Sequence, residues 1–504
     1  MSERVAVIDL GSNSARLIIM QIYKNGAYNL IYHQKEAVRL SEGIAQDNKL
    51  QSAAMERALR SLQTFSHMCR LFNVDKTLAV GTAAVRNTKN GGAFVERVRK
   101  ETGIPLRAVS GETEAKLGYL GAINTLDVEN ALLFDLGGGS TELTLIRNRK
   151  AEHMISLPFG AVNMTERFRL NNRASEGQLD ELQAFFRKQL NQLPWLKNLN
   201  VPLLGVGGTA RTIAKMDQRR KNYPFPKLHN YRMGSMSFRA LWQDVSKLSF
   251  AQRRKVPGLG GERADIILAG IGIVKALQEK AHAQQLIVSG CGVREGLFLQ
   301  YLLSRSGQSE VVANPLEHST KNTLLLYNGN ISHAEHVTKL ADQLFCGCRD
   351  FFALDDRSRL MLRTAALLHD TGISINYYDH YRHSTYLVEN ARLFGLSHRE
   401  QMLAAVITGW HHGPAFRFDH NRLYHQFLDE ADWQTARKLA LLLSIAESLD
   451  TTQMTLVKNV NAQIEAGRLS LQLDASAPTP LEQDAALRFS KWLRRDFQLE
   501  LALK

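Results

Sequence analysis

The sequence contains little cysteine and no long apolar run, and each shortage excludes a class of protein. With 4 cysteines in 504 residues, the chain cannot carry a disulfide framework. Cys346 and Cys348 form a single CxC pair without the second pair that a zinc site needs, so we expect no zinc there. No apolar stretch approaches the roughly 18 residues of a membrane-spanning helix. The first residues run directly into a strand pattern instead of a leader segment, so we expect a cytoplasmic protein without a membrane partner.

Acidic residues are also scarce relative to basic ones. The 63 Lys and Arg residues exceed the 49 Asp and Glu residues, which gives a formal charge of +14. Such a surplus favours an anionic partner: a nucleic acid, a phosphate polymer, a nucleotide or an acidic lipid. A basic solvated surface explains the surplus equally well. The remaining composition, 44% hydrophobic and 22% charged, is typical of a globular protein and excludes disorder.

Two stretches of the chain repeat one order of elements. In each, an apolar strand ends in Asp, a Gly-rich turn follows, and a second strand begins. This repetition predicts an α/β fold of two duplicated halves, residues 1–125 and 126–306, with a cleft between them. The strands that carry the repeat are expected at Val5–Leu10, Ala15–Ile22, Ala131–Asp135 and Glu142–Ile146. Further elements are expected at Ser52–Met68 and Ala93–Glu101 (helices), and at Lys76–Val80, Leu106–Val109, Val201–Gly205 and Gln285–Ser289 (strands).

The character of the sequence changes after about residue 306. Ser306–Pro315 is mostly polar and ends in proline, which predicts a linker. Residues 307–455 have a helical pattern and predict an all-α domain that holds most of the 16 histidines. In the remaining residues, 456–504, a strand at Gln463–Leu473 and a helix at Leu481–Phe497 predict a small α+β cap.

The chemistry of the first half is carried by Gly-rich turns at strand ends. Two of them begin with an aspartate, Asp9–Ser14 (DLGSNS) and Asp135–Glu142 (DLGGGSTE). Glycine lets the backbone approach a ligand closely, and successive N–H groups can form a concave nest for phosphate oxygens. The leading aspartates can hold Mg²⁺. Two further turns, Gly205–Thr209 and Ser289–Gly296, also follow strands, so the four together predict a cleft for a nucleotide or a polyphosphate.

These motifs resemble a known family. The segments VIDLGSNSARLII, RLSEG, GTAAVRN, SGETEAKL, FDLGGGSTEL, SLPFGAVNMTERF, GVGGTARTIA and IVSGCGVREG occur in order across residues 4–300. They are similar to the exopolyphosphatase / guanosine pentaphosphate phosphohydrolase family. The resemblance implies two ribonuclease-H-like halves of the actin-like ATPase superfamily with an active site between them. It also implies removal of the terminal phosphate of inorganic polyphosphate or of pppGpp, with Mg²⁺ or Mn²⁺ as cofactor.

The resemblance assigns roles to individual residues. Glu114 is implied to activate the attacking water and Arg86 to contact phosphate, while the nearby Glu112 is the alternative carboxylate. Arg16 and Arg263 stand where relatives frame the guanine or ribose of pppGpp. The implied magnesium-associated residues are Asp9, Asp135 and Glu142, and the implied phosphate-binding residues are Ser12, Asn13, Ser14, Gly137, Gly138, Gly139, Ser140, Thr141, Gly207, Gly208 and Thr209.

Three alternatives remain open from the sequence. An ATPase or sugar kinase shares the fold, although a water-activating Glu114 favours hydrolysis. The third alternative, after the ATPase and the sugar kinase, is a sensor that binds polyphosphate or a nucleotide without catalysis. Polyphosphate and pppGpp are both open as partners, no nucleic acid is expected, and the family resemblance suggests a homodimer. Basic residues that could line a polyphosphate channel, or equally a solvated loop, are Arg219, Arg220, Lys221, Lys227, His229, Arg253, Arg254 and Lys255.

The histidines of the helical region form a second pattern. Their order resembles the HD-domain phosphohydrolases, whose signature is His, then His-Asp, then Asp. The resemblance implies a divalent-metal site, with Glu447 standing at the usual Asp position and Asp450 nearly one turn later. A dimerisation domain with inherited histidines is the alternative. The implied ligands are His333, His369, Asp370, His383, His411, His412 and Glu447.

Overall fold

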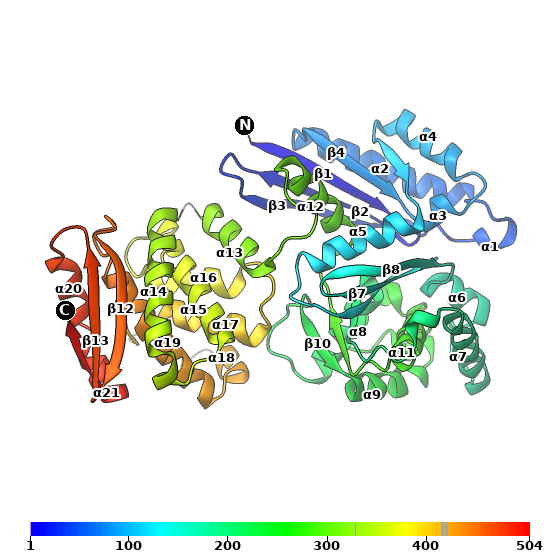
Figure 1. Ribbon diagram of the computed structural model, residues 1–504. Coiled ribbons are helices and arrows are strands. Elements are labelled where there is room, and N and C mark those ends of the chain that lie inside the picture. The colour runs from blue at the N-terminus through cyan, green and yellow to red at the C-terminus, as the bar shows by residue number, and fades with distance from the viewer. Residues whose placement is uncertain (1, 328, 415–417, 419–421) are drawn as a thin grey trace. The chain divides into compact units, whose positions relative to one another are not determined.

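The computed structural model describes residues 2–327, 329–414, 418 and 422–504 (Figure 1). The chain divides into two units. One runs to Pro315 without Asn25–Ala27, and the other contains Leu316–Lys504 together with that short segment. Among the described residues, no helix combines the length and the apolar character that a membrane crossing requires.

The first unit begins with a lobe built on a five-stranded sheet of order β3-β2-β1-β4-β5. The three strands β3, β2 and β1 pair antiparallel, whereas β4 and β5 continue the sheet in parallel with β1. One face of the sheet packs on the long helices α2 and α4 through fully buried side chains such as Ile8 and Leu62. The elements are β1 (Glu3–Leu10), β2 (Ser14–Ile22), β3 (Tyr28–Ala37), α1 (Ile44–Asp47), α2 (Ser52–Leu71), β4 (Lys76–Gly81), α3 (Ala83–Arg86), α4 (Gly91–Thr102), β5 (Leu106–Ala108) and α5 (Gly111–Ile123).

The second lobe repeats this topology around a six-stranded sheet of order β10-β11-β9-β6-β7-β8. The strands β8, β7, β6, β9 and β11 have the same order and the same directions as β3, β2, β1, β4 and β5. The predicted duplication of an α/β lobe is therefore confirmed. The elements are β6 (Ala131–Leu136), β7 (Thr141–Arg147), β8 (Lys150–Leu157), α6 (Ala161–Phe168), α7 (Glu176–Asn191), η1 (Pro194–Leu196), β9 (Leu203–Val206), α8 (Gly207–Arg220), β10 (Tyr231–Gly234), α9 (Ser235–Ser246), α10 (Phe250–Arg253), η2 (Gly261–Arg263), α11 (Ile267–Ala281), β11 (Gln285–Val288) and α12 (Val293–Arg305).

Two helices, α5 and α12, cross between the lobes. Helix α5 follows the first sheet in sequence but packs on the second, whereas α12 follows the second sheet and packs on the first through Phe298 and Leu299. The two helices meet at glycines. A Cβ on Gly121 would overlap the Gly292 carbonyl, and a Cβ on Gly296 would overlap the Leu117 carbonyl. This close approach fixes the first turns of both helices, which carry charged side chains, beside the space between the lobes.

The second unit is helical and ends in a small sheet. Its three strands have the order β12-β13-β14. The elements are α13 (Pro315–Leu326), α14 (Ile331–Phe352), α15 (Asp356–Leu368), η3 (Thr371–Ser374), α16 (His380–Asn390), α17 (His398–Gly409), α18 (Arg422–Phe427), α19 (Glu430–Ser448), β12 (Val457–Glu465), β13 (Arg468–Ala475), α20 (Pro480–Leu487), α21 (Ser490–Phe497) and β14 (Glu500–Leu503).

Two predicted elements of this unit are wrong. The expected strand Gln463–Leu473 is a hairpin, because Ala466 and Gly467 both take positive φ, 49° and 74°, and turn the chain within two residues. The expected helix Leu481–Phe497 is interrupted after Leu487 and continues as the separate helix α21.

Candidate functional site

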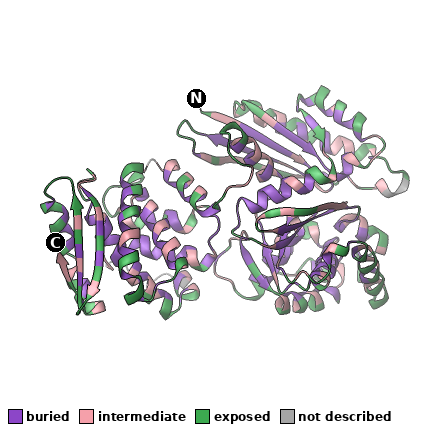
Figure 2. Cartoon of the chain, in the orientation of Figure 1, coloured by how far each residue is buried: buried purple, intermediate pink, exposed green. Residues whose placement is uncertain are grey.

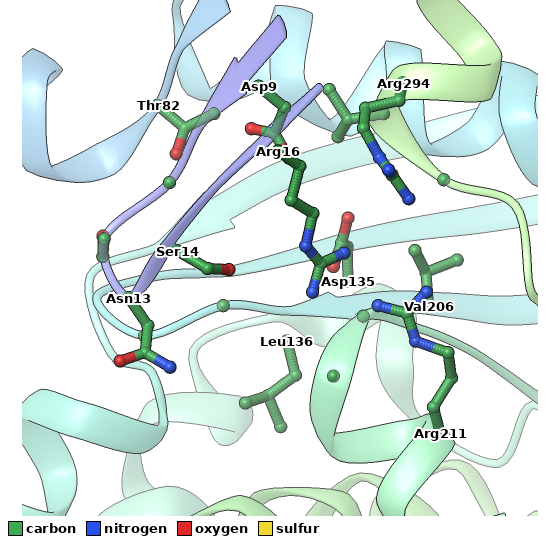
Figure 3. Close-up of a pocket in the computed structure, with 18 of the residues that line it drawn as sticks. Asp9, Asn13, Ser14, Arg16, Thr82, Asp135, Leu136, Val206, Arg211 and Arg294 are labelled. Carbon is green, nitrogen blue, oxygen red and sulfur yellow. The ribbon is translucent and has the colours of Figure 1, made fainter. Parts of the chain in front are cut away.

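The first unit contains a cavity of about 110 Å³ between its two lobes (Figure 3). Loops from both lobes line it, and most of them follow the carboxyl end of a strand, namely β1, β4, β6, β9 or β11. The predicted residues that lie on the cavity wall are Asp9, Ser12, Asn13, Ser14, Arg16, Glu114, Asp135, Gly137, Gly138, Ser140, Gly207, Gly208 and Arg263. The predicted site thus assembles largely as the motifs indicate.

The two Asp-led loops have the same local structure. In the first, the amide of Gly11 donates to Ser14 O over 3.1 Å, and in the second the amide of Gly137 donates to Ser140 O over 3.0 Å. Both glycines lie where a Cβ would crowd that carbonyl, at 3.2 and 3.3 Å. The loops are therefore structural equivalents that face each other from the two lobes.

Asp9 and Asp135 end the two central strands and face the cavity from opposite lobes. In the described part of the chain, neither carboxylate accepts a hydrogen bond or pairs with a cation within 4 Å. Burial raises the pKa of Asp9, and burial together with the charge of Asp9 raises the pKa of Asp135 to about 6. A Cβ on Gly207 would lie 2.8 Å from Asp135 Oδ1, so glycine keeps this oxygen accessible. Unsatisfied oxygen ligands facing a polar cavity fit a bound Mg²⁺ or Mn²⁺.

Four guanidinium groups gather at the same cavity. Arg16 comes from β2, Arg211 from α8, Arg263 from η2 and Arg294 from the first turn of α12; Figure 3 shows Arg16, Arg211 and Arg294 directed at the cavity around Asp135. Burial, and repulsion by Arg16, lower the pKa values of Arg211 and Arg263 to about 10, so both remain charged at neutral pH. Buried arginines at this density suit a ligand with several negative charges.

Sequence reasoning missed Arg211, Arg294 and the neighbouring Glu295 as cavity residues. Both arginines lie at the starts of the helices α8 and α12, directly after or within the Gly-rich turns that follow β9 and β11. The sequence feature that could have predicted them is an arginine near the N-terminus of a helix that directly follows a Gly-rich loop. There the helix N-terminus and the arginine face the same ligand.

Glu114 lies in the first turn of α5 and is 8% exposed. Ser110 caps the helix by accepting a hydrogen bond from the Thr113 amide, which fixes this turn. Burial raises the pKa of Glu114 to about 7, although the partner Arg86 works in the opposite direction. The neighbouring Glu112 is exposed on the same helix. Of the two candidate carboxylates, Glu114 is thus the one at the cavity.

The structure places Arg86 beside Glu114 and not among the residues that line the cavity. Its Nη1 donates to Glu114 Oε2 over 2.7 Å and to the Val109 carbonyl over 3.1 Å, and the side chain does not line the cavity. Its Nη2 lies 4.0 Å from Glu142 Oε1, and Glu142 accepts a hydrogen bond from Ser156. Arg86 therefore lies between two buried carboxylates, with its guanidinium nitrogens directed at Glu114 and Glu142. The ion pair with Glu114 restricts the orientation of that carboxylate.

Four other predicted residues lie behind the cavity wall rather than on it. Thr141 Oγ1 donates to the Phe159 carbonyl, and Thr209 Oγ1 accepts from Arg263 Nη2, with both threonines fully buried. Glu142 is 1% exposed, and Gly139 packs on Ser12. Their contacts hold the loops in shape, and the two threonine side chains are not available to a phosphate.

Two of the proposed channel residues are structural instead. Arg253 is fully buried and donates to three successive carbonyls, those of residues 170–172. His229 bonds the Thr125 carbonyl and the Gly290 amide. The channel expectation is therefore wrong for these two residues, because Arg253 is fully buried with its Nη2 on backbone carbonyls, and both ring nitrogens of His229 bond backbone groups.

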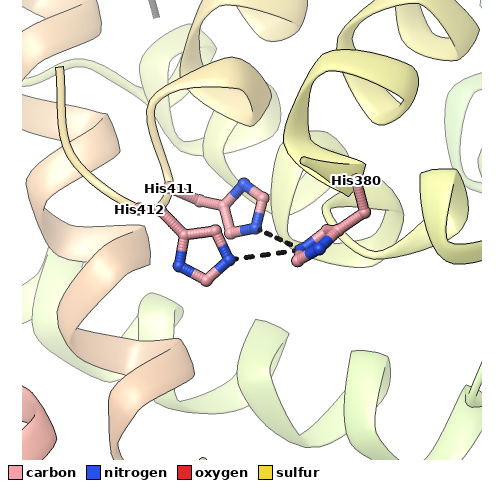
Figure 4. Close-up of side chains that lie close together, drawn as sticks. All are labelled: His380, His411 and His412. Carbon is pink, nitrogen blue, oxygen red and sulfur yellow. Dashed lines mark hydrogen bonds between the residues drawn. The ribbon is translucent and has the colours of Figure 1, made fainter. Parts of the chain in front are cut away.

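The second unit brings histidines together around Asp370. Its Oδ1 lies 3.1 Å from His380 Nε2 and 3.5 Å from His369 Nε2, and its Oδ2 lies 3.7 Å from His333 Nε2. His411 Nε2 and His412 Nε2 lie 3.1 and 3.2 Å from His380 Nε2 (Figure 4). Two triads of this cluster have metal-ligand spacing: His380, His411, His412 and His333, His369, Asp370.

The hydrogen bonds of these rings aim their Nε2 atoms inward. Nδ1 of His369 lies 2.7 Å from the Ala366 carbonyl, and Nδ1 of His411 lies 2.6 Å from the Thr408 carbonyl. A carbonyl can only accept, so both Nδ1 atoms are protonated and both Nε2 atoms carry lone pairs. His369 Nε2 is buried without a hydrogen-bond partner. Burial lowers the pKa of both rings, so a metal cation suits these lone pairs better than protons do.

One predicted ligand of this cluster is wrong. His383 belongs to neither triad and packs against Gly372, whereas His380, which sequence reasoning missed, takes its place at Asp370. Glu447, in the last turn of α19, and Asp450, just after the helix, contact different histidines. Glu447 lies 3.8 Å from His412 Nδ1, and Asp450 lies 2.8 Å from His333 Nδ1 and orients that ring.

An arginine-rich cavity between duplicated lobes, with a strand-end aspartate from each, places the chain in the actin-like class of phosphate-binding proteins. Within that class it belongs to the Ppx/GppA phosphatase family, whose model matches residues 18–305. The model of the third domain of Ppx/GppA phosphatases matches residues 317–490. The family resemblance drawn from the motifs is thereby confirmed.

Known proteins with this fold cover much of the chain. The Aquifex aeolicus member of the Ppx/GppA family is 32% identical with a TM-score of 0.53, over 60% of this chain and 99% of that one. An exopolyphosphatase from Cytophaga hutchinsonii is 24% identical with a TM-score of 0.57, over 62% and 100%. A bifunctional 3-dehydroquinate synthase/phosphatase from Fusobacterium nucleatum is 30% identical over 298 residues. That match covers 56% of this chain but 44% of the relative, so the chain spans under half of the relative's length.

Proposed function

We propose that the protein is a magnesium- or manganese-dependent exopolyphosphatase that hydrolyses the terminal phosphate of inorganic polyphosphate. The observation that carries this proposal is Glu114, a buried carboxylate at the cavity with its pKa raised to about 7. A general base with a pKa near the working pH is deprotonated in a large fraction of the molecules and still binds a proton well. Hydrolysis of pppGpp, alone or beside polyphosphate, is the alternative activity.

In the proposed reaction, a water oxygen attacks the terminal phosphorus while Glu114 accepts a proton from that water. The bond from this phosphorus to the bridging oxygen breaks, and its electron pair stays on the shortened chain. The products are inorganic phosphate and a chain one phosphate shorter. Arg86 holds the Glu114 carboxylate toward the water through its 2.7 Å ion pair.

Charge on the phosphate oxygens is balanced by residues on the cavity wall. Arg16, Arg211 and Arg294 supply the guanidinium groups, and the two Asp-led loops supply backbone amides. Asp9 and Asp135 are the residues suited to hold the divalent cation, which when bound neutralises phosphate charge. Glu142 supports Arg86 from behind the wall in this proposal, and does not contact the cation directly.

Exchange of one carboxylate for its amide tests the proposal. Glu114→Gln keeps the shape but removes the base, so we expect phosphate release from long-chain polyphosphate to fall about 10²–10⁴-fold. The matched control is Glu112→Gln, an exposed glutamate two residues away, which should leave turnover unchanged. Equal turnover by Glu114→Gln and wild type would refute the role of Glu114. Polyphosphate binding without any release by the wild-type protein would favour a sensor.

A competition experiment separates the two substrates. Polyphosphate and pppGpp are supplied at equal concentrations of terminal phosphate, and the rates of release are compared. Arg16 and Arg263 stand at the cavity where a nucleoside could be contacted. If pppGpp is the main substrate, the exchange of Arg263 for glutamine should lower its kcat/KM more than that of tripolyphosphate.

We further propose that the cluster around Asp370 is an HD-type centre for one or two divalent metal ions. The inward-facing Nε2 atoms of His369 and His411 support this proposal, since buried lone pairs around a carboxylate suit a cation. In the full-length protein, His369→Ala should lower the Mn²⁺ retained after gel filtration by the share of this cluster, and leave the share held at Asp9 and Asp135. His383→Ala, a histidine outside both triads, should lower neither share. Equal metal content in both variants would contradict the proposed centre.

A further inference from the structure

A second cavity, of about 680 Å³, opens in the same unit along the outer half of α8. Two of the segments that line it, α8 and the chain just before η2, also reach the candidate active site. On α8, Gly208 and Arg211 line the active-site cavity, whereas Lys215 and Arg219 line the second one. The segment beside the helix divides in the same way, with Arg263 at the active site and 258–260 at the second cavity.

The order of residues on these two segments places the second cavity next to the first along α8. Arg211, Lys215 and Arg219 follow at intervals of four, so they lie on one face of the helix. They span two turns, roughly 12 Å at 1.5 Å per residue. A row of three basic side chains therefore leads from the active-site cavity to the second cavity.

Close contacts with α8 hold the segments that line the second cavity in place. Gly258 has φ of 89°, and a Cβ there would lie 2.6 Å from the Lys215 carbonyl, so the glycine lets this segment pack directly on α8. On the other side, Gln218 Nε2 donates to the Lys227 carbonyl over 2.8 Å and holds the segment 222–227. Both flanking segments are thus tied to the helix that carries the cations.

The charge of this cavity is uncompensated. None of the described residues that line it is acidic, and within the described chain neither Lys215 nor Arg219 forms an ion pair. The next basic residues on the same helix differ, since Arg220 pairs with Asp244 at 3.2 Å and Lys221 pairs with Asp217 at 2.7 Å. Exposed but unpaired cations beside a cavity attract an extended anion.

We propose that the second cavity holds internal phosphates of a polyphosphate chain whose terminal phosphate occupies the active-site cavity. Lys215 and Arg219 are then the residues that set the preference for long chains. This inference rests on the proposed exopolyphosphatase activity and adds where the rest of the substrate lies. A short chain ends before it reaches these residues and gains nothing from them.

The test compares substrates of different length in one pair of variants. In Lys215→Gln/Arg219→Gln, KM for long-chain polyphosphate should rise about tenfold, while kcat stays constant and KM for tripolyphosphate is unchanged. The rise of KM with salt should also become shallower, because fewer counterions are released. Arg220→Gln removes a neighbouring but paired charge and should change neither substrate.

Three outcomes would overturn the inference: no change in KM for long chains, an equal change for tripolyphosphate, or an equal effect of Arg220→Gln. A separate measurement keeps the inference independent of catalysis. Equilibrium binding of long-chain polyphosphate to Glu114→Gln should weaken about tenfold when Lys215 and Arg219 are also exchanged. If the wild-type protein binds polyphosphate through Lys215 and Arg219 but does not hydrolyse it, the proposed activity alone is refuted. If the exchange of Lys215 and Arg219 leaves the binding affinity unchanged, the proposed role of the second cavity is refuted.

Discussion

At the scale of single residues, the most informative contact is the ion pair between Glu114 and Arg86. The raised pKa of about 7 means that Glu114 becomes an effective base only as pH rises through neutrality. We expect kcat/KM to fall below pH 7, to about a tenth of its plateau near pH 6. The sign for stability is opposite, because the folded state binds the proton more tightly than the unfolded one between pH 4.5 and 7. This residue therefore lowers stability as pH rises through that window.

Arg86 sets where this limb of the pH profile lies. Since Arg86 lowers the pKa of Glu114, Arg86→Gln should move the acidic limb to higher pH by about one unit. Arg86→Lys keeps the charge and should restore most of the shift. A pH–rate profile for both variants measures this. A loss of rate with no shift in the profile would contradict the positioning role and would favour direct phosphate contact.

The same scale shows why some site residues escape sequence reasoning. His380 and His383 lie three residues apart at the start of α16, and the sequence does not tell which one faces Asp370. Arg86 was assigned from its motif, but the partner that occupies its guanidinium, Glu114, stands 28 residues later. Residue types and spacing predict which side chains gather, whereas the pairing among them depends on helix register and burial.

At the scale of elements, the predicted strands are the inner strands of both sheets and the short edge strand β5. Strands β1 and β6 are apolar and end in Asp-led turns, so pattern and turn chemistry agree. The edge strands β3 and β8 were not predicted, because their residues are mostly polar and partly exposed. Pairing with β2 and β7, and not their own composition, makes them strands. The crossing of α5 and α12 was likewise invisible, since it depends on contacts between residues far apart in sequence.

That crossing yields a prediction about stability. Gly296→Ala adds a methyl group that would overlap the Leu117 carbonyl, so the two helices must separate. We expect a loss of about 2 kcal/mol or more of unfolding free energy, measured by denaturant unfolding. Gly177→Ala on α7 is the matched control, because nothing lies within 4 Å of its added Cβ. Equal stability of the two variants would contradict the close helix contact. Activity should fall with Gly296→Ala too, since both helices carry cavity residues.

At the scale of the whole molecule, the chain consists of two units that each bury their own apolar side chains (Figure 2). Their candidate sites are chemically different. The first unit presents carboxylates and arginines, which suit phosphate with a hard cation, and the second presents imidazoles, which also suit softer divalent metals. Two separate cores with two separate ligands predict two ligand-specific effects on unfolding.

Differential scanning calorimetry of the full-length protein can detect this separation. We expect two transitions, because each unit has its own interior. Mn²⁺ at 100 times its Kd should stabilise the second unit by about 2.7 kcal/mol through binding to the folded state. In Glu114→Gln, which we expect to hydrolyse the ligand about 10²–10⁴-fold more slowly, long-chain polyphosphate should raise the midpoint of the other transition. His369→Ala should remove the response to Mn²⁺ at the second unit's transition and leave the polyphosphate response intact, and His383→Ala should leave both. If Mn²⁺ raised that transition equally in the wild type, His369→Ala and His383→Ala, the imidazole cluster would not be the metal site. A metal bound by His369 must be held more weakly once this ligand is removed.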